Sequence, residues 1–350
     1  MPETITAIAE ERPYAPSWID RFNDRVRDLP VPAWMFYVIF GLALIAVQLL
    51  FLWLEGGLGE MGLMPVVIFN SLFTPFLLGL ISLLDRQAVA ALQSMRSVLA
   101  MAEPELRRYR YLLAHMPRRG AWAAGLGVVI FTILLEQLGT TPVRYAALQQ
   151  LPLFTFVFQI IDKSSAFLFG IFFYHTFRQL RLVNTIHGHH IRIHLFNLRP
   201  LQAFSRVTAS TAAGLVVGVY GWMLINPELL SDPWIFGFLL MSTIMAVAVF
   251  VWPLYGVHRR MEAAKDKALK EIDLRFEAVF DKFNRGFQED DFSAVESLQG
   301  VIASLDIQHN RIKAIPTWPW SPETAQFAIT TIGLPLVLAI IRFFIEQYLL

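Results

Sequence analysis

Four polar residues in the middle of a long apolar run are the strongest chemical signal in this sequence. They are Asp162, Lys163, Ser164 and Ser165, and the apolar run extends from 151 to 177. As a helix, these 27 residues would measure about 40 Å, which exceeds the roughly 30 Å hydrocarbon core of a bilayer. Ionisable groups at such a depth are costly. They mark an ion or proton path, or a buried polar cluster that ties helices together. The sequence leaves both readings open.

Few other polar residues at a similar depth could accompany this group. Asp162 and Lys163 are adjacent, so their side chains leave a helix about 100° apart and cannot form an ideal pair along one face. We therefore expect each of them to have a partner elsewhere in the structure or to face a water-filled cavity. Asn70 and Thr74 lie at a comparable depth in a second apolar run, and Glu136 lies nearer the outer end of a third. A long lysine side chain could reach that glutamate.

The composition and the apolar runs predict the class of fold. Hydrophobic residues make up 55% of the 350 residues and charged residues only 16%, against about 25% charged residues in soluble domains. Seven segments satisfy the length and polarity expected of spanning helices. They lie at 32–54, 63–84, 120–138, 151–177, 202–225, 233–257 and 322–348. We therefore predict an all-α polytopic integral membrane protein with seven transmembrane helices.

The basic residues predict the orientation of these spans. Of the 29 lysines and arginines, 26 fall in four segments that would lie on one side: 1–31, 85–119, 178–206 and 258–320. The positive-inside rule then places the N-terminus in the cytoplasm and the C-terminus outside, in a multi-pass protein of the cell (inner) membrane. The bilayer is thus the first expected partner. Arginines alternate with Tyr109 and Tyr111 around 107–119, which predicts a helix lying on the anionic lipids of the inner leaflet.

The chain divides into four parts on this reading. A cytoplasmic tail occupies 1–31, and 32–257 holds the first six spans with helical cytoplasmic connections at 85–119 and 178–200. Two heptad seams between 258 and 315, separated by polar residues, predict a cytoplasmic antiparallel helical hairpin. The last part, 316–350, is an interfacial return followed by the seventh span. This order of spans, with long cytoplasmic helix extensions, is similar in layout to insect chemoreceptor channels.

Three histidines after the fourth span suggest a second kind of chemistry. His187, His190 and His194 share one face of a helix by their spacing, and neutral histidines one turn apart can ligate a metal. No carboxylate lies within ten residues of them. Imidazoles beside arginines are also typical of wet interfaces, and a pH-sensing role is a third reading.

Small residues at a spacing of four predict a close helix contact. Ser210, Gly214 and Gly218 lie on one face of the fifth span, and such a face allows another helix to approach closely. The partner helix would come from the same chain or from a second copy, so these residues are also the predicted interface of a homo-oligomer.

The sequence contains no cysteine, which excludes disulfides, thiolate metal sites and a cysteine nucleophile. Phosphate-binding loops, nucleophile elbows and zinc-protease motifs are also missing. We expect no cofactor, no enzymatic activity and, with a net charge of only +1, no nucleic-acid partner. The intramembrane charges favour an oligomeric channel or transporter for ions or small solutes, with a midplane polar site on the helix at 151–177. The alternative is a membrane-anchored sensor or scaffold that binds a cytoplasmic protein partner through 258–315.

Overall fold

The computed structural model describes residues 13–59, 64–137, 150–189, 195–226, 233–288 and 292–348, in which helices are joined by turns and loops and no strand is formed. The helices follow in the order α2 (Trp18–Arg27), α3 (Ala33–Leu54), η1 (Gly57–Gly59), α4 (Met64–Ser94), α5 (Glu103–Ala114), α6 (Arg118–Gln137), α7 (Pro152–His189), α8 (Ala203–Ile225), α9 (Pro233–Gln288), α10 (Phe292–Lys313), α11 (Pro322–Ala328), η5 (Ile329–Gly333) and α12 (Leu334–Tyr348).

Six helical segments among the described residues are long and apolar enough to cross a membrane. They are Ala33–Leu54, Met64–Ser94, Pro152–Gly188, Ala203–Ile225, Phe236–Lys282 and Pro322–Ile345. The prediction of a multi-pass all-α membrane protein is therefore confirmed. The predicted span at 120–138 corresponds to α6, which is not among the six, so the count of seven stays a prediction.

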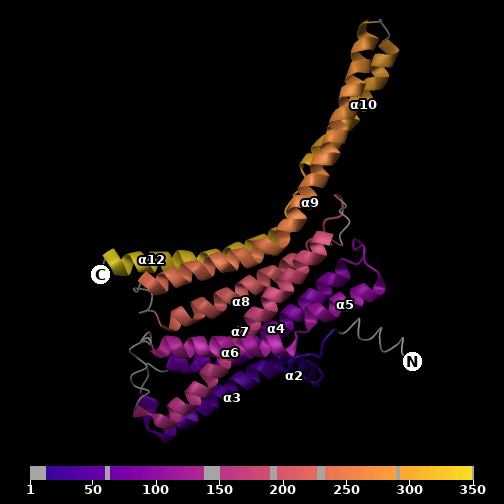
Figure 1. The fold of residues 1–350 in the computed structure, drawn as a ribbon. Helices are drawn as coiled ribbons and strands as arrows, with labels where there is room; N and C mark the ends of the chain where they lie inside the picture. Colours follow the sequence, from indigo (N-terminus) through magenta and orange to yellow (C-terminus); the bar gives the residue numbers. More distant parts are fainter. Residues whose placement is uncertain are drawn as a thin grey trace, which may run out of the picture.

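Helices α4 and α7 form the centre of the bundle (Figure 1). Helix α4 packs against α3, α7 and α8, and α7 packs against α4, α6 and α9. Their shared core contains large buried side chains such as Ile81, Leu84 and Phe172. By contrast, α3 and the segment from α11 to α12 bury few of their side chains in the chain itself. In a bilayer, these apolar outer faces would contact lipid.

Helix α7 begins where α3 ends, and Glu55 joins the two. The Glu55 carboxylate accepts hydrogen bonds from the backbone N–H groups of Leu153 (2.9 Å) and Phe154 (2.8 Å). Pro152, the first residue of α7, has no N–H to satisfy. The carboxylate therefore caps the N-terminus of α7 and complements its dipole. We call this side of the bundle the Glu55 end.

Replacing Glu55 by alanine should lower the free energy of unfolding in detergent micelles by about 1 kcal/mol, because two amides at the start of α7 lose their acceptor. A denaturant titration measures the change. Glu277→Ala, at an exposed position of α9, is the control and should change stability by less than about 0.5 kcal/mol. Equal losses in the two variants would contradict the capping role.

Helix α9 is 56 residues long, or about 84 Å, and it continues far beyond the bundle (Figure 1). Helix α10 runs back along it in the opposite direction. Lys265 Nζ donates to the carbonyls of Lys313 (2.6 Å) and Ile315 (2.9 Å), and His309 lies 3.7 Å from Asp273. Buried Ile272 and Leu305 meet between the two helices. We call this antiparallel pair (262–313) the arm, and the side where it leaves the bundle the arm end.

The chain returns from the arm to the bundle through a row of stacked rings. Trp318 lies 3.9 Å from the ring of His258 and 4.4 Å from Trp320, which in turn stacks on Phe250 at 5.4 Å. This segment is not helical, and the chain becomes helical again at Pro322. The stack fixes the place where α11, η5 and α12 begin.

Two connections differ from the expected helices. In the 85–119 connection, α4 continues to Ser94 and α5 covers Glu103–Ala114, but 95–102 is not helical. In the 178–200 connection, α7 is described as far as His189, 190–194 lie outside the described residues, and those from 195 onward form turns. Residues 95–102 and 195–200 are therefore not helical, although helices were expected there.

Candidate functional site

Lys163 lies between two carboxylates at the contact of α6 and α7. Its Nζ donates to Asp162 Oδ2 at 2.9 Å and also to Glu136 on α6. The three side chains are 20% (Lys163), 31% (Asp162) and 33% (Glu136) exposed, so the group lies at the surface of the bundle. Lys163 is 11 residues from Pro152, about 17 Å along α7 from the Glu55 end. We call Glu136, Asp162 and Lys163 the charged triad.

The contact between Asp162 and Lys163 corrects one expectation, and the contact between Lys163 and Glu136 agrees with another. Adjacent side chains on a helix point apart, and for this reason Asp162 and Lys163 were expected not to pair. The flexible lysine stem bends back far enough to contact its neighbour as well as Glu136. The contact with Glu136 is the one that the lysine's reach predicts.

The other predicted members of the site are not in the triad. Thr74 and Ser165 share a buried hydrogen bond of 2.8 Å between α4 and α7, and the Asn70 amide donates to the carbonyl of Phe158 at 3.3 Å. Ser164 donates to the carbonyl of Ile160 in its own helix (2.7 Å). The structure thus divides the predicted cluster into an exposed charged triad and a buried neutral seam between α4 and α7.

Pro75 is next to the seam. It lies inside α4 directly after Thr74, and a proline frees a backbone carbonyl one turn earlier and bends the helix. Buried polar groups in a membrane must find partners within the protein. The seam satisfies Asn70, Thr74 and Ser165 in pairs, which is the arrangement of a structural contact and not of an open aqueous path.

The three histidines are not brought together by the described residues. His187 is buried, with Nδ1 3.3 Å from the carbonyl of Pro253 and its ring against Phe204. His190 and His194 lie outside the described residues. Within the part of the chain that the structure describes, no three potential metal-ligating side chains gather at one place. The histidine metal site stays a prediction.

The small-residue face of α8 is covered within the chain. A Cβ added to Gly214 would lie 2.3 Å from a methyl group of Leu80 on α4, and one added to Gly218 would lie 3.3 Å from Phe73. Both glycines are buried, whereas Ser210 is half-buried. Because α4 occupies this face, a second copy cannot pack against the two glycines. A homo-oligomer would have to use another face.

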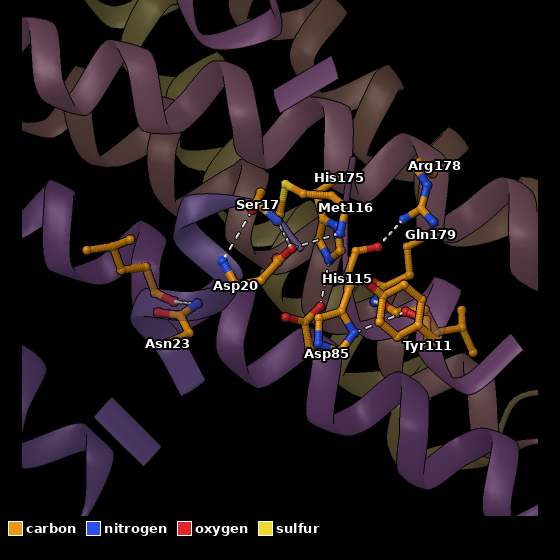
Figure 2. Close-up of polar contacts among 12 residues, drawn as sticks. Ser17, Asp20, Asn23, Asp85, Tyr111, His115, Met116, His175, Arg178 and Gln179 are labelled. Atoms are coloured by element: carbon orange, nitrogen blue, oxygen red, sulfur yellow. Dashed lines mark hydrogen bonds and ion pairs between the residues drawn. The ribbon is translucent and has the colours of Figure 1, made fainter. Parts of the chain in front are cut away.

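A buried hydrogen-bonded pair that the sequence did not reveal joins α4 to α7 near the arm end. His175 Nε2 lies 2.6 Å from Asp85 Oδ1, and both side chains are inaccessible to solvent. Figure 2 shows His175 directed at Asp85 between the helices. A buried carboxylate needs a partner of this kind because its desolvation is otherwise uncompensated.

The N-terminal segment also folds onto the bundle beside this pair. Ser17 and Asp20 form a capping box for α2 (2.7 and 3.2 Å), and Asp20 Oδ2 accepts a further hydrogen bond from the N–H of Met116 at 3.0 Å (Figure 2). Ile19 and Val26 are buried, Ile19 in the main core. The tail expected at 1–31 is therefore partly structural, because 17–27 is a docked helix.

Helix α7 contacts the N-terminal segment through Arg178, and it contacts the end of α5 through Arg178 and Gln179. Arg178 donates to the carbonyl of His115 (2.7 Å) and to the hydroxyl of Tyr14, and Gln179 donates to the carbonyl of Leu113 at 3.0 Å. Burial raises the pKa of the Tyr14 phenol far above its usual range, although the charge of Arg178 acts in the opposite direction. Tyr14 therefore remains a neutral hydroxyl.

One local signal could have identified part of this network. The spacing Ser17-Trp18-Ile19-Asp20 is a capping box followed by an amphipathic helix. The Asp85–His175 pair has no such signal, because 90 residues separate its members. Comparisons with protein-family models, curated proteins and solved structures found no match for this chain.

Proposed function

We propose that the protein is an oligomeric channel or transporter of the cell membrane, and that cations pass or bind at the charged triad. The observation that carries the proposal is the position of the triad. Asp162 and Lys163 lie within a helix long and apolar enough to cross a membrane, Glu136 lies on α6 beside them, and all three side chains are partly exposed at the surface of the bundle. Charged side chains in this situation are rare unless they face a partner, a cavity or an ion.

The charges of the triad favour a cation. Two carboxylates and one ammonium carry one net negative charge. In a medium of low dielectric constant, an uncompensated charge is unfavourable. A proton or a small cation would compensate it, whereas an anion would add to the imbalance. The substrate class is therefore a proton or a small inorganic cation.

The surroundings of the triad favour a path between copies of the chain. Phe156 and Ile160 on α7 and Ile133 on α6 are exposed on the same side as the triad. The polar side chains of the α4–α7 seam, by contrast, are satisfied in pairs inside the bundle. A second copy packed on the α6–α7 face would remove the triad from lipid and enclose it. This interface replaces the one first expected on α8.

The proposal also states which end of the bundle faces the cytoplasm and that α6 crosses the membrane. The arginines at the start of α6 and those of α5 lie at the arm end, and Figure 1 shows the C-terminus at the opposite end of the bundle. By the positive-inside rule, the arm end faces the cytoplasm, with anionic inner-leaflet lipids beside α5. Helix α6 is antiparallel to α7 and supplies the span predicted at 120–138, which brings the number of spans to seven, and the arm is the cytoplasmic hairpin.

An ion-flux assay on protein reconstituted in liposomes tests this proposal. We expect wild-type protein to conduct K⁺, Na⁺ or protons but not chloride. Glu136→Gln and Asp162→Asn should each lower the cation flux by about tenfold or more, which corresponds to about 1.4 kcal/mol in the barrier. Glu277→Gln, on the exposed surface of the arm, is the matched control and should leave the flux unchanged.

The thermal melting point of each variant must be measured beside its flux, because a misfolded variant would also fail to conduct. Flux at the wild-type rate in folded Glu136→Gln and Asp162→Asn would show that the path lies elsewhere. A wild-type protein that conducts none of these ions would contradict the channel itself.

A second candidate is a sensor or scaffold that acts through the arm. It is favoured by exposed apolar side chains on a part of the molecule that extends beyond the bundle. Leu274, Phe280 and Ile307 are each about half exposed or more, and apolar patches that face water often mark interaction sites. This candidate predicts no ion flux and a cytoplasmic protein partner that is lost when the arm is deleted.

A further inference from the structure

A groove lies between α8 and the last helix of the chain, at the depth of the spanning segments. Its volume is about 480 Å³, which falls within the range of small-molecule sites. Its walls are apolar apart from a few polar side chains. Val217 and Leu224 of α8 form one wall, and Leu334 and Leu338 of α12 form the other. These four side chains are exposed, so the groove opens toward the lipid.

The course of the last helix explains why the groove exists. Residues Ile329–Gly333 form a π-helical turn, and Pro335 follows it. Both features bend helices. The π-helical turn packs against α8 and α9, and α12 packs against α9, where Phe343 and Phe236 stack at 4.3 Å. The groove is the space that remains between α8 and α12 after this bend.

The length of the groove fits one acyl chain. It extends along the last helix from Thr330 to Arg342, a distance of about 18 Å. The hydrocarbon core of a bilayer is about 30 Å thick and two chains deep, so one acyl chain spans about 15 Å. An aqueous ligand would have no path to these walls, because they face the hydrocarbon. Lipid is the occupant that the surroundings supply.

A cationic side chain at one end of the groove favours a lipid whose headgroup contains a phosphate. Arg342 lies near the C-terminal end of α12, at the level where α8 ends. A guanidinium has five N–H donors in a planar arrangement that matches a phosphate, so an interaction inside the protein leaves other donors for a ligand. The apolar walls can therefore hold the acyl chain of one lipid while Arg342, at the end of the groove, contacts the phosphate of the same lipid.

We infer that this groove binds one acyl chain of a glycerophospholipid, with the lipid phosphate at Arg342. The bound chain fills the gap between α8 and α12 and supports the last helix, which buries few of its own side chains. The site is independent of the charged triad, which lies on α6 and α7. Its test uses lipid binding and not ion flux, so it can fail or succeed separately from the proposed channel.

Native mass spectrometry of the delipidated full-length protein provides the test. The probes are phosphatidylglycerol with two oleoyl chains and, as a lipid without phosphate, dioleoylglycerol. Val217→Trp places an indole in the groove, and we expect it to weaken phosphatidylglycerol binding by at least about tenfold because the ring excludes the chain. Val38→Trp is the matched control, because Val38 on α3 is 49% exposed and Val217 is 47% exposed.

Arg342→Gln tests the headgroup contact. It should weaken phosphatidylglycerol binding by about tenfold, since a charge-assisted phosphate contact is lost, and leave dioleoylglycerol binding unchanged. Equal binding of phosphatidylglycerol to Val217→Trp and Val38→Trp would overturn the site, because the lipid would then be bound only as part of the general lipid layer. Full binding of phosphatidylglycerol to Arg342→Gln would overturn the assignment of the phosphate.

Discussion

Replacing His175 by leucine is expected to lower the free energy of unfolding by about 3–5 kcal/mol, because it leaves the carboxylate of Asp85 buried without a partner. In the wild-type protein, His175 Nε2 is 2.6 Å from Asp85 Oδ1, and neither side chain reaches solvent. A loss of this size is a large part of the 5–15 kcal/mol that stabilises a typical domain. Denaturant titration in detergent micelles measures it.

The double substitution Asp85→Leu with His175→Leu separates two explanations. Replacing both members of a buried pair by apolar side chains is often nearly neutral, so the double variant should be clearly more stable than His175→Leu alone. His309→Leu, at a partly exposed site of α10 that faces Asp273, is the control and should cost at most about 1 kcal/mol. If the double variant is as unstable as the single one, the loss comes from packing and not from the unpaired charge.

Gly170→Leu should separate α6 from α7. A Cβ at position 170 would lie 2.4 Å from the backbone carbonyl oxygen of Ala124 and 2.9 Å from Val128. The obstacle is backbone, so it cannot move without shifting the whole helix. Overpacking of this kind costs about 1–3 kcal/mol or more. It would also move Glu136 away from Lys163, so the contacts of the charged triad should be lost together with stability.

Gly127→Leu is the matched control for this prediction. Gly127 is a glycine of α6, and a Cβ there would meet nothing within 4 Å. Because glycine is about 1 kcal/mol less favourable than good helix formers in a helix interior, this variant should be neutral or more stable than wild type. Gly170→Leu is therefore expected to lower the melting point, whereas Gly127→Leu is expected to raise it or leave it unchanged. Equal melting points in detergent would show that α6 and α7 do not approach as closely as Gly170 requires.

The extent of the helices was largely predictable because apolar length is a local property. The segment predicted at 32–54 is α3, Ala33–Leu54, and the one predicted at 202–225 is α8, Ala203–Ile225. Connections were predicted less well. Residues 95–102 are not helical, and the described residues from 195 onward form turns, although helical connections were expected at 85–119 and 178–200. The positions of basic and apolar residues do not predict where a helix ends outside the bundle, because tertiary contacts determine that end.

For the candidate sites, too, the sequence did not show which side chains meet. The reach of a lysine side chain predicted the contact between Lys163 and Glu136, but the contact with Asp162 depended on how the stem bends. The glycines of α8 marked a close approach, and only the fold showed that Leu80 and Phe73 of the same chain fill it. The groove beside α12 had no sequence signal, since it depends on how α12 is positioned relative to α8 and α9.

By itself, the sequence determined that this chain is a bundle of membrane helices with charged residues at a costly depth, because hydropathy and helix length act residue by residue along the chain. The tertiary structure alone decided which polar groups meet. Asp85 and His175 are 90 residues apart in the chain, and the segment at 14–27 contacts α7 through Tyr14 and Arg178. Such pairs depend on how helices are arranged, and that arrangement follows from the sum of many packing contacts.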